Sequence, residues 1–423
     1  MLRYPDTWYS RTLAERHERP ALAGRIVVDC AVVGAGFAGL FAARALARGG
    51  MKVAVLEAES VGFGASGRNG GFVSDGFAAG AASIRRRVGA AQAAALHDLS
   101  AEGVEIMRGA IAGQAIPGAD PVDGILRLRR FDRGDDLQAE AGPDLAYLDR
   151  AAIGERIDSR RYFHGLEERR AFHIHPLNVV RGLAAEVERL GGLVFEGSAV
   201  TACELDGAVK VLRTAGGVVE AGQVIFATGG YTGRLVPRLR RAMLPIATYV
   251  MVSEPAPELL AEAIRTRMAI GDDRRAGDYY RLIEGGARLL WGGRITTRAA
   301  DVPGIVRELR AEMLGAYPQL EGLDTAMAWS GLMSYARHRM PMIGALGPGV
   351  WHALGFGGHG LNTTAIGGTV LAEKLLGTSD RIALFAPFGL DWAGGPLGLL
   401  AAQGTYWALQ AQDWWREKNS RGD

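Results

Sequence analysis

Cysteine is scarce in this chain. Only Cys30 and Cys203 occur among 423 residues, and they form no CxxC pair. This excludes a disulfide framework and a cysteine-based zinc site, and it favours a reducing cytoplasm. Lysine is almost as rare, at four of the 48 basic residues, and the formal net charge is only +2. Such a balance gives no overall field that would attract nucleic acid or an acidic membrane.

The chain also lacks a long apolar segment and several short motifs. Its longest uncharged stretch, residues 340–372, contains nine glycines and two prolines, so it makes a poor membrane span. Residues 1–20 show no apolar core of a signal peptide. No GxSxG and no GxxxxGK[ST] loop occurs. His173 and His175 would share one strand face, but no third ligand stands at metal spacing, so no metal site is predicted.

Glycine, in contrast, is abundant at 60 residues and gathers around a few predicted turns. The apolar run 26–33 predicts a buried parallel strand, and residues 37–48 predict a helix stopped by Gly49. Between them, Gly34-Ala-Gly-Phe-Ala-Gly39 has the GxGxxG spacing that lets a pyrophosphate approach a helix N-terminus. Glu57 ends the next predicted strand, where a carboxylate binds ribose hydroxyls and repels a 2′-phosphate. The turn therefore predicts FAD or NAD rather than NADP.

Further glycine-rich turns favour a flavin. In residues 62–71, six of ten residues are Gly or Ser, so the backbone is expected to approach a flat or anionic group closely. Ser66, Arg68 and Asn69 would add side-chain donors there. Residues 355–360 precede a predicted helix, whose N-terminus would stabilise negative charge on a reduced flavin. Ala227-Thr-Gly-Gly230 ends another predicted strand beside the dinucleotide.

These motifs together resemble the D-amino-acid oxidase superfamily of FAD-dependent oxidoreductases, which includes glycine and sarcosine oxidases. Within it the chain is most similar to the γ-glutamylputrescine oxidase branch. The resemblance rests on Val32-Val-Gly-Ala-Gly-Phe-Ala-Gly39, Gly62-Phe-Gly-Ala-Ser-Gly-Arg-Asn-Gly-Gly71, His173-Ile-His-Pro-Leu-Asn178, Asp278-Tyr-Tyr-Arg-Leu282 and Gly355-Phe-Gly-Gly-His-Gly360.

The resemblance implies an α/β fold, in which a Rossmann-like FAD-binding domain is interleaved with an antiparallel-sheet substrate domain that has helices behind it. The FAD-binding domain is expected to comprise residues 27–95, 150–234 and 329–385, and the substrate domain residues 96–149 and 235–328. Residues 1–26 and 386–423 are expected to be peripheral terminal segments. Residues 193–195, 200–205 and 209–214 predict a small antiparallel set of strands.

The resemblance also implies FAD as the cofactor. Sarcosine oxidase-like members attach the flavin to a cysteine that aligns with Gly331 here, and no histidine lies in the early glycine-rich loop, so FAD is predicted to be non-covalent. The residues predicted to contact it are Gly34, Ala35, Gly36, Phe37, Ala38, Gly39, Glu57, Ala58, Gly64, Ala65, Ser66, Gly67, Arg68, Asn69, Gly70, Gly71, Val200, Ala227, Thr228, Gly229, Gly331, Gly355, Gly357, Gly358, His359, Gly360, Leu361 and Asn362.

Flavin oxidation of an amine depends on an oriented C–H bond, a dry site and an uncharged nitrogen. Aromatic side chains favour the neutral amine by desolvation, and Trp329 is a candidate for this lining. Tyr279 and Tyr280 are neighbours in a predicted strand, so only one faces the flavin, and we favour Tyr280. His359 is expected near the flavin pyrimidine edge.

Charged residues give the remaining expectations about substrate. A distal substrate carboxylate would need a fork such as Arg281, Arg294 or Arg337. The predicted catalytic set is Tyr280, His359, Trp329 and Arg281. Asn362 stands where relatives carry a lysine for a substrate carboxylate, which argues against sarcosine or a simple α-amino acid.

The leading hypothesis is an FAD-dependent oxidase of a primary or secondary amine, such as a γ-glutamylated polyamine. Hydride would pass from the C–N carbon to the flavin, the imine would hydrolyse, and O2 would be reduced to H2O2. A second hypothesis keeps the fold but uses an amino acid or other substrate, or a carrier in place of O2. A hypothesis of another class is an NAD-dependent dehydrogenase. The oligomeric state is left open by the sequence.

Overall fold

The central strand of the molecule is the predicted apolar run. A computed structural model describes residues 4–274, 277–297 and 302–420, and in it β1 (Gly24–Val33) pairs in parallel with β2 (Val53–Leu56) and β10 (Gly217–Phe226). Cys30 and Val32 enter one apolar core, whereas Ala31 and Val33 enter another on the opposite face. Because both faces are covered, the strand has a continuous rather than alternating apolar sequence.

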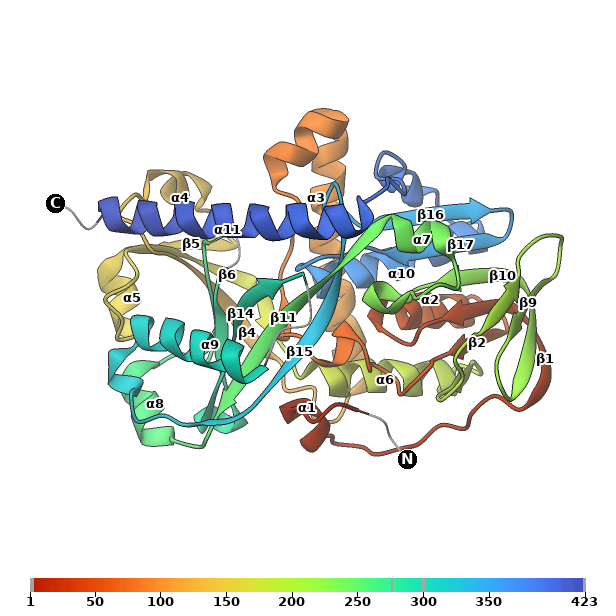
Figure 1. Cartoon of the computed structure of the whole chain (residues 1–423), viewed down its shortest axis with the longest axis horizontal. Coiled ribbons are helices and arrows are strands. Elements are labelled where there is room, and N and C mark those ends of the chain that lie inside the picture. Colours follow the sequence, from red (N-terminus) through yellow and green to blue (C-terminus); the bar gives the residue numbers. More distant parts are fainter. Residues whose placement is uncertain (1–3, 275–276, 298–301, 421–423) are drawn as a thin grey trace.

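The first sheet has the strand order β16–β17–β10–β1–β2–β7. Outside this order, β9 pairs with β10, and β8 pairs with β9. Its other strands are β7 (Leu193–Phe195), β8 (Ala202–Glu204), β9 (Lys210–Arg213), β16 (Met342–Gly347) and β17 (Val350–Leu354). Four helices share the core on one face of this sheet: α2 (Phe37–Arg48), α3 (Ala81–Gln114), α6 (Pro176–Arg189) and α10 (Gly360–Leu376). Figure 1 shows α2, α6 and α10 gathered beside this sheet.

The second sheet lies beside the first, and most of its strands are antiparallel (Figure 1). Its strand order is β15–β11–β14–β13–β12–β4–β6–β3, with β5 on β6. The strands are β3 (Phe72–Val73), β4 (Val122–Arg129), β5 (Leu145–Leu148), β6 (His164–His173), β11 (Met243–Ser253), β12 (Ala269–Asp272), β13 (Tyr279–Ile283), β14 (Arg288–Thr296) and β15 (Thr325–Ala336). Tyr249 and Met251 point to a second core, and Val250 and Val252 point back to the first.

Shorter helices and the two chain ends complete the structure. The second core is covered by α5 (Arg150–Arg156), α8 (Pro257–Ala263) and α9 (Val302–Ala316). The remaining helices are α1 (Trp8–Arg11), α4 (Asp135–Glu140), α7 (Pro237–Arg241) and α11 (Gly395–Ser420). Helix α11 runs along the outside of the molecule and ends near the C-terminus (Figure 1). Within the described ranges, none of the helices has both the length and the apolarity needed to cross a bilayer.

The two-sheet α/β architecture confirms the predicted fold class. The predicted antiparallel set is wrong in one strand, because β7 pairs in parallel with β2 and only β8 and β9 are antiparallel. Several predicted domain boundaries also differ from the sheets. The boundary at 95/96 falls inside α3, whose inward side chains share the core of α2 and α10. The segment from 150 begins with α5 and β6 of the second sheet, and the boundary at 328/329 divides β15.

Candidate functional site

The first glycine turn connects β1 to α2. Gly34 has φ +105°, and a Cβ there would lie 2.7 Å from the carbonyl oxygen of Ala227. Phe37 donates its backbone N–H to Ser66 Oγ at 3.0 Å, whereas the N–H groups of Gly36 and Ala38 have no protein acceptor in the described part of the chain. Free N–H groups at a helix N-terminus, beside a turn without side chains, fit a pyrophosphate.

Glu57 follows β2 and its carboxylate lies against this turn. Oε2 accepts the Ala35 N–H at 2.8 Å, and Oε1 accepts the Glu59 N–H at 3.1 Å. Burial raises the pKa of Glu57, and the backbone donors oppose that shift. A carboxylate has about four lone-pair sites, so it can still accept from a ribose hydroxyl. The residues at this turn therefore fit the adenosine half of a dinucleotide such as FAD.

The second glycine stretch, residues 62–71, is the glycine loop. It packs on the first turn, since Gly62 donates its N–H to the Ala35 carbonyl at 3.0 Å. Asn69 stabilises this loop from within. Its Nδ2 donates to the Ala65 carbonyl at 2.9 Å, and its Oδ1 accepts the Gly71 N–H at 2.8 Å. Both donors of the Asn69 amide are used within the loop, and its contact with the cofactor stays a prediction.

Arg68 has a similar role. Its Nε donates to the Phe63 carbonyl at 2.9 Å, its Nη1 donates to the Ser330 carbonyl at 3.3 Å, and the guanidinium lies 4.8 Å from the Phe63 ring centroid. On the other side of the loop, Trp329 of β15 donates Nε1–H to the Arg68 carbonyl at 3.0 Å. These contacts fix the loop backbone, so contact with the cofactor stays a prediction for the loop's backbone atoms.

Arg281, on β13, ties the second sheet to this loop. Nε donates to the Gly70 carbonyl at 2.9 Å, and Nη2 donates to the Ile174 carbonyl at 2.8 Å and to Tyr9 Oη at 3.1 Å. Nη1 donates to His173 Nδ1 at 2.8 Å. The side chain is buried and all three nitrogen atoms are bonded to protein acceptors. The prediction that Arg281 is a fork for a substrate carboxylate is therefore wrong; Arg281 is a positioning residue.

Tyr9 is a site residue that the sequence analysis missed. It lies in α1, within the segment predicted to be peripheral, yet its side chain is fully buried. Its hydroxyl donates to the Asn69 carbonyl at 2.8 Å while accepting from Arg281. No motif surrounds Tyr9, so only the folded chain reveals that the N-terminal segment holds the glycine loop.

The two histidines of the HIHPLN motif have fixed tautomers. His173 ends β6 and His175 caps α6, so they do not share one strand face as predicted. Because His173 Nδ1 accepts from the guanidinium described above, its Nε2 carries the hydrogen and donates to the Arg267 carbonyl at 2.9 Å. His175 Nδ1 accepts the Asn178 N–H at 3.1 Å, so its Nε2 donates to Thr12 Oγ1 at 3.0 Å. Burial lowers the pKa of each ring to about 3.

Stability is therefore expected to fall as the pH drops below 6.5, the ordinary histidine pKa, towards 3. Over this window the unfolded chain binds protons that folded His173 and His175 exclude, which lowers the free energy of unfolding by about 1.4 kcal/mol per pH unit for each ring. His175→Asn keeps an acceptor at the helix N-cap and removes the titration. It should reduce the slope by about that amount in urea unfolding at pH 7, 6 and 5. His97→Asn, at an exposed position, is the matched control, and equal slopes in the two variants would contradict the prediction.

Tyr279 and Tyr280 point to opposite faces of β13, as expected for a strand. Tyr280 is fully buried in the second core, with its ring 4.1 Å from that of Trp291 and its hydroxyl 2.8 Å from Tyr317 Oη. Tyr279 packs on the glycine loop, since a Cβ on Gly70 would lie 2.6 Å from its Cε2. Tyr280 therefore does not lie against the glycine loop, as the prediction that it faces the cofactor requires, whereas Tyr279 does.

The third glycine turn, residues 355–360, leads into α10. Ser334 of β15 fixes it, accepting the Gly355 N–H on Oγ at 3.1 Å and the Gly357 N–H on its carbonyl at 2.9 Å. His359 is the N-cap of α10 but makes no side-chain cap bond. Desolvation by the surrounding protein lowers the pKa of His359, while part of the residue remains exposed to solvent. His359 and the N-terminus of α10 thus lie next to each other at this turn.

Asn362 lies one turn into this helix. Its Nδ2 donates to the Gly76 carbonyl at 3.1 Å and to the Ser100 carbonyl at 3.3 Å, and the side chain is buried. It therefore bonds α10 to the chain around α3 and does not replace a carboxylate-binding lysine. The remaining predicted contacts at Gly358, Gly360 and Leu361 are placed on this turn and the start of α10.

Other predicted cofactor contacts lie around the same centre. A Cβ on Gly331 would lie 3.3 Å from Arg68 Cγ, which places β15 against the loop. Thr228 and Gly229 follow β10, next to the Gly34 turn, and Ala58 follows Glu57. Val200 is half-buried against the core on the other face of the first sheet. Its contact with the cofactor stays a prediction.

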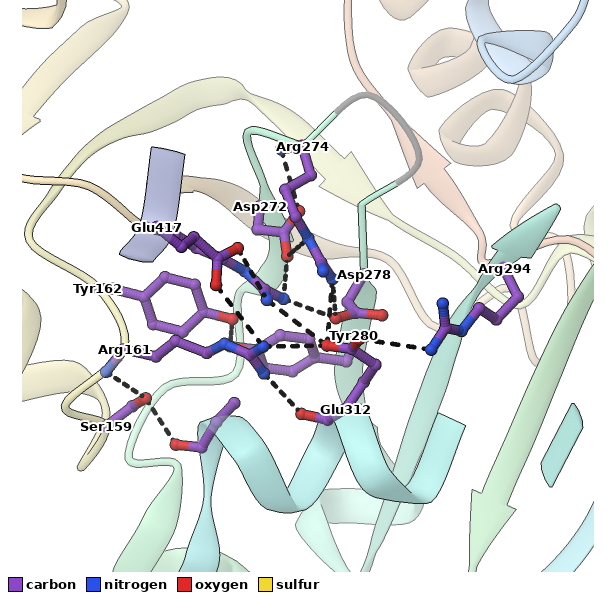
Figure 2. A network of polar contacts seen from close by, with 12 residues as sticks. Ser159, Arg161, Tyr162, Asp272, Arg274, Asp278, Tyr280, Arg294, Glu312 and Glu417 are labelled. Atoms are coloured by element: carbon purple, nitrogen blue, oxygen red, sulfur yellow. Dashed lines mark hydrogen bonds and ion pairs between the residues drawn. The ribbon is translucent and has the colours of Figure 1, made fainter. Parts of the chain in front are cut away.

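A separate charged cluster lies on the helix-covered face of the second sheet (Figure 2). Arg130 is fully buried and forms ion pairs with Asp272 and, at 2.6 Å, with Asp278 of the DYYRL motif. Glu312 of α9 and Glu417 of α11 each lie 3.5 Å from Arg130 Nη1. The motif at 278–282 thus serves both sides of the sheet: Asp278 binds the cluster and Arg281 the glycine loop. In the described ranges no group of three or more His, Cys, Asp or Glu is placed to hold a metal ion.

Comparison with known proteins agrees with this geometry. A protein-family model described as "DAO: FAD dependent oxidoreductase" matches residues 29–374. The chain is 33% identical to the "Gamma-glutamylputrescine oxidoreductase" of Escherichia coli (strain K12) over 396 residues, which cover 91% of this chain and 92% of that protein. The crystal structure of glycine oxidase from Geobacillus kaustophilus superposes with a TM-score of 0.72 at 21% identity, covering 86% of this chain and 98% of that one. The L-amino acid deaminase of Proteus myxofaciens gives the same TM-score at 15% identity, with 89% and 96% covered.

Proposed function

The chain belongs to the DAO family of FAD-dependent oxidoreductases, and from that premise we propose that it oxidises a primary or secondary amine, with a γ-glutamylated amine as the favoured substrate class. The name of the Escherichia coli relative supports this choice. FAD, when bound, accepts the hydride from the carbon next to the nitrogen. We propose that it is held without a covalent bond, since the cysteines of this chain lie in β1 and β8, away from the glycine loop.

The observation that supports the substrate class is that the two arginines touching the glycine loop are hydrogen-bonded to protein acceptors. Arg68 and Arg281 both donate to backbone carbonyls, and the Asn362 amide is bonded to Gly76 and Ser100. None of these three side chains keeps a free donor fork for an α-carboxylate. A substrate whose reacting carbon carries only a nitrogen needs no such fork, which supports an amine over an α-amino acid.

The aromatic residues around the loop have a desolvating role in this proposal. Tyr279 packs on Gly70, Trp329 is held by the Arg68 carbonyl, and a Cβ on Gly357 would lie 2.8 Å from Tyr335 Cε1. Burial raises the pKa of Tyr279 and of Tyr335, so both phenols stay protonated at neutral pH and act as walls rather than bases. An apolar wall favours the uncharged amine. His359, neutral at pH 7, is able to accept a proton that the amine releases.

The acceptor completes the proposal. We expect the amine and O2 to give an imine and H2O2, after which water hydrolyses the imine to a carbonyl compound and releases the nitrogen as an amine or ammonia. A carrier in place of O2, with the same amine, is the second candidate. The NAD-dependent alternative is set aside, because the family is FAD-dependent. A cytoplasmic location stays a prediction.

A substrate panel tests the proposal. Under anaerobic conditions, γ-glutamylputrescine or putrescine should bleach the flavin absorbance near ~450 nm. Sarcosine and D-amino acids should bleach it at a rate at least ~100-fold lower. The same reaction in air should release one H2O2 per amine consumed. Bleaching by amino acids alone would overturn the substrate class, and bleaching without H2O2 would overturn O2 as the acceptor.

A further inference from the structure

Large exposed apolar side chains gather on the last helix and on the segment just before it. Ten large apolar side chains are exposed among the described residues, and six of them lie between residues 392 and 415. They are Trp392, Leu397, Leu400, Trp407, Trp414 and Trp415, each 58–71% exposed. Soluble monomers rarely leave a contiguous apolar area of this kind uncovered, so it indicates an interaction surface.

The exposed residues of α11 have a regular spacing. Leu397, Leu400, Gly404, Trp407, Ala411, Trp414 and Lys418 alternate at intervals of three and four, and all seven are exposed. This is the a/d pattern of a helix that packs against another helix. We call these seven residues the α11 stripe.

The opposite side of α11 is fixed to the body of the protein. Tyr406 Oη accepts the Ile295 N–H at 3.3 Å, and Gln403 Oε1 accepts the Thr297 N–H at 3.1 Å. Glu417 reaches the buried Arg130 cluster, in which it is labelled in Figure 2. The helix is therefore held as a preformed rod whose stripe points away from its own chain.

We propose that the α11 stripe binds the same stripe of a second copy of this chain, with the two helices antiparallel. One register of such a pair places both tryptophans of the stripe against small residues. Trp407 packs on Ala411 of the partner subunit, and Gly404 receives Trp414 of the partner subunit. In this register every a position faces a d position of the other helix, as antiparallel pairs require.

The distribution of charge favours this partner and orientation. The only charged residues of α11 are Asp413, Arg416, Glu417 and Lys418, at one end. In an antiparallel pair they lie beside the uncharged first half of the other helix, whereas a parallel pair would bring like charges together. Their charges sum to zero, so the helix lacks the basic face that draws an amphipathic helix to anionic lipid.

The exposed area also fits a pairing of helices. The four large apolar side chains of the stripe and the adjacent Trp415 are each 58–71% exposed and present on the order of 600 Å² of apolar surface, against the ~800 Å² that a standard-size interface buries on each partner. A twofold pairing of α11 would cover that surface in both copies at once.

Sedimentation of the flavin-loaded full chain tests the proposal. The wild type should have twice the mass of one chain at micromolar concentration, and Trp407→Arg and Trp414→Arg should each weaken self-association at least ~100-fold. Gln412→Arg introduces the same charge on the exposed flank of the helix and should remain dimeric, while circular dichroism and flavin absorbance should be the same in all four proteins. A monomeric wild type would overturn the proposal, and so would Trp407→Arg and Trp414→Arg proteins that remain dimeric. Flotation of a monomeric wild type with phosphatidylcholine–phosphatidylglycerol vesicles would overturn it as well.

The register has its own test. Ala408 flanks the stripe beside Trp407 and would face Ala408 of the partner subunit near the twofold axis. A short bis-maleimide should therefore cross-link Ala408→Cys into covalent dimers at least ~10-fold faster than Thr405→Cys, which lies on the same helix outside the stripe. The wild type, with Cys30 and Cys203 only, measures the background. Equal rates at the two positions would contradict the antiparallel register.

Discussion

Replacing Gly39 with alanine is expected to give a destabilised protein that purifies with less than a tenth of the wild-type flavin. A Cβ at Gly39 would overlap the carbonyl oxygen of Gly34 and lie 3.1 Å from Val32 Cγ1 and 3.3 Å from the Ala227 Cβ. All three belong to the backbone or short side chains of strands and turn, so relief requires α2 to move away from β1. Such overpacking costs about 3 kcal/mol, and the movement opens the turn that fits the pyrophosphate.

The measurement compares two Gly→Ala changes, each within a helix. Gly109 of α3 has no heavy atom within 4 Å of an added Cβ, so Gly109→Ala should keep its flavin and gain up to about 1 kcal/mol from helix propensity. Melting temperature and the ratio of flavin to protein absorbance report both effects. A Gly39→Ala protein as yellow and as stable as Gly109→Ala would refute the close contact of helix and turn.

Replacing Arg281 with methionine is expected to destabilise the fold by about 3–5 kcal/mol and to weaken FAD binding at least ~100-fold. The change leaves the carbonyls of Gly70 and Ile174, His173 Nδ1 and Tyr9 Oη without the donor they share. These buried acceptors belong to the glycine loop and the segments behind it, so the loop loses its attachment to the second sheet. Arg281→Lys should rescue little, because one ammonium cannot replace a planar fork.

A second arginine in a strand, Arg25, serves as the control that distinguishes positioning of the glycine loop from substrate binding. Arg25 of β1 is exposed and pairs with Glu220 at 2.8 Å, so Arg25→Met should change the stability by less than about 0.5 kcal/mol. Urea unfolding and flavin titration of both variants give the comparison. If Arg281→Met instead raised KM while its unfolding curve and flavin affinity matched those of Arg25→Met, Arg281 would be a substrate-binding residue.

The local parts of the site were predictable because their determinants are neighbours in sequence. The apolar run, the GxGxxG turn and the helix at 37–48 all follow from residues within one βαβ unit, and α2 has the predicted bounds. Strand alternation likewise predicted that Tyr279 and Tyr280 diverge. Alternation alone does not say which of the two tyrosines enters the second core. The structure shows that Tyr280 does, because its side chain packs on Trp291 and Tyr317.

Roles set by distant partners were not predictable. An arginine in a family motif suggests an anionic substrate, but the partners of Arg281 are backbone carbonyls and rings spread over residues 9–174. Tyr9 had no motif around it for the same reason. Helix α3 was divided by the predicted boundary at 95/96 because helical periodicity does not reveal which core its apolar face enters.

The residues that Arg281 binds lie far from it in the sequence, and this affects the order of folding during synthesis. Arg281 bonds Gly70, 211 residues earlier, and Tyr9, 272 residues earlier. During synthesis, the nucleotide-binding turn at the beginning of the chain therefore emerges from the ribosome long before its neighbouring loop can be fastened. We therefore expect the flavin to be retained only late in synthesis, and nascent chains that end before Arg281 should not retain it.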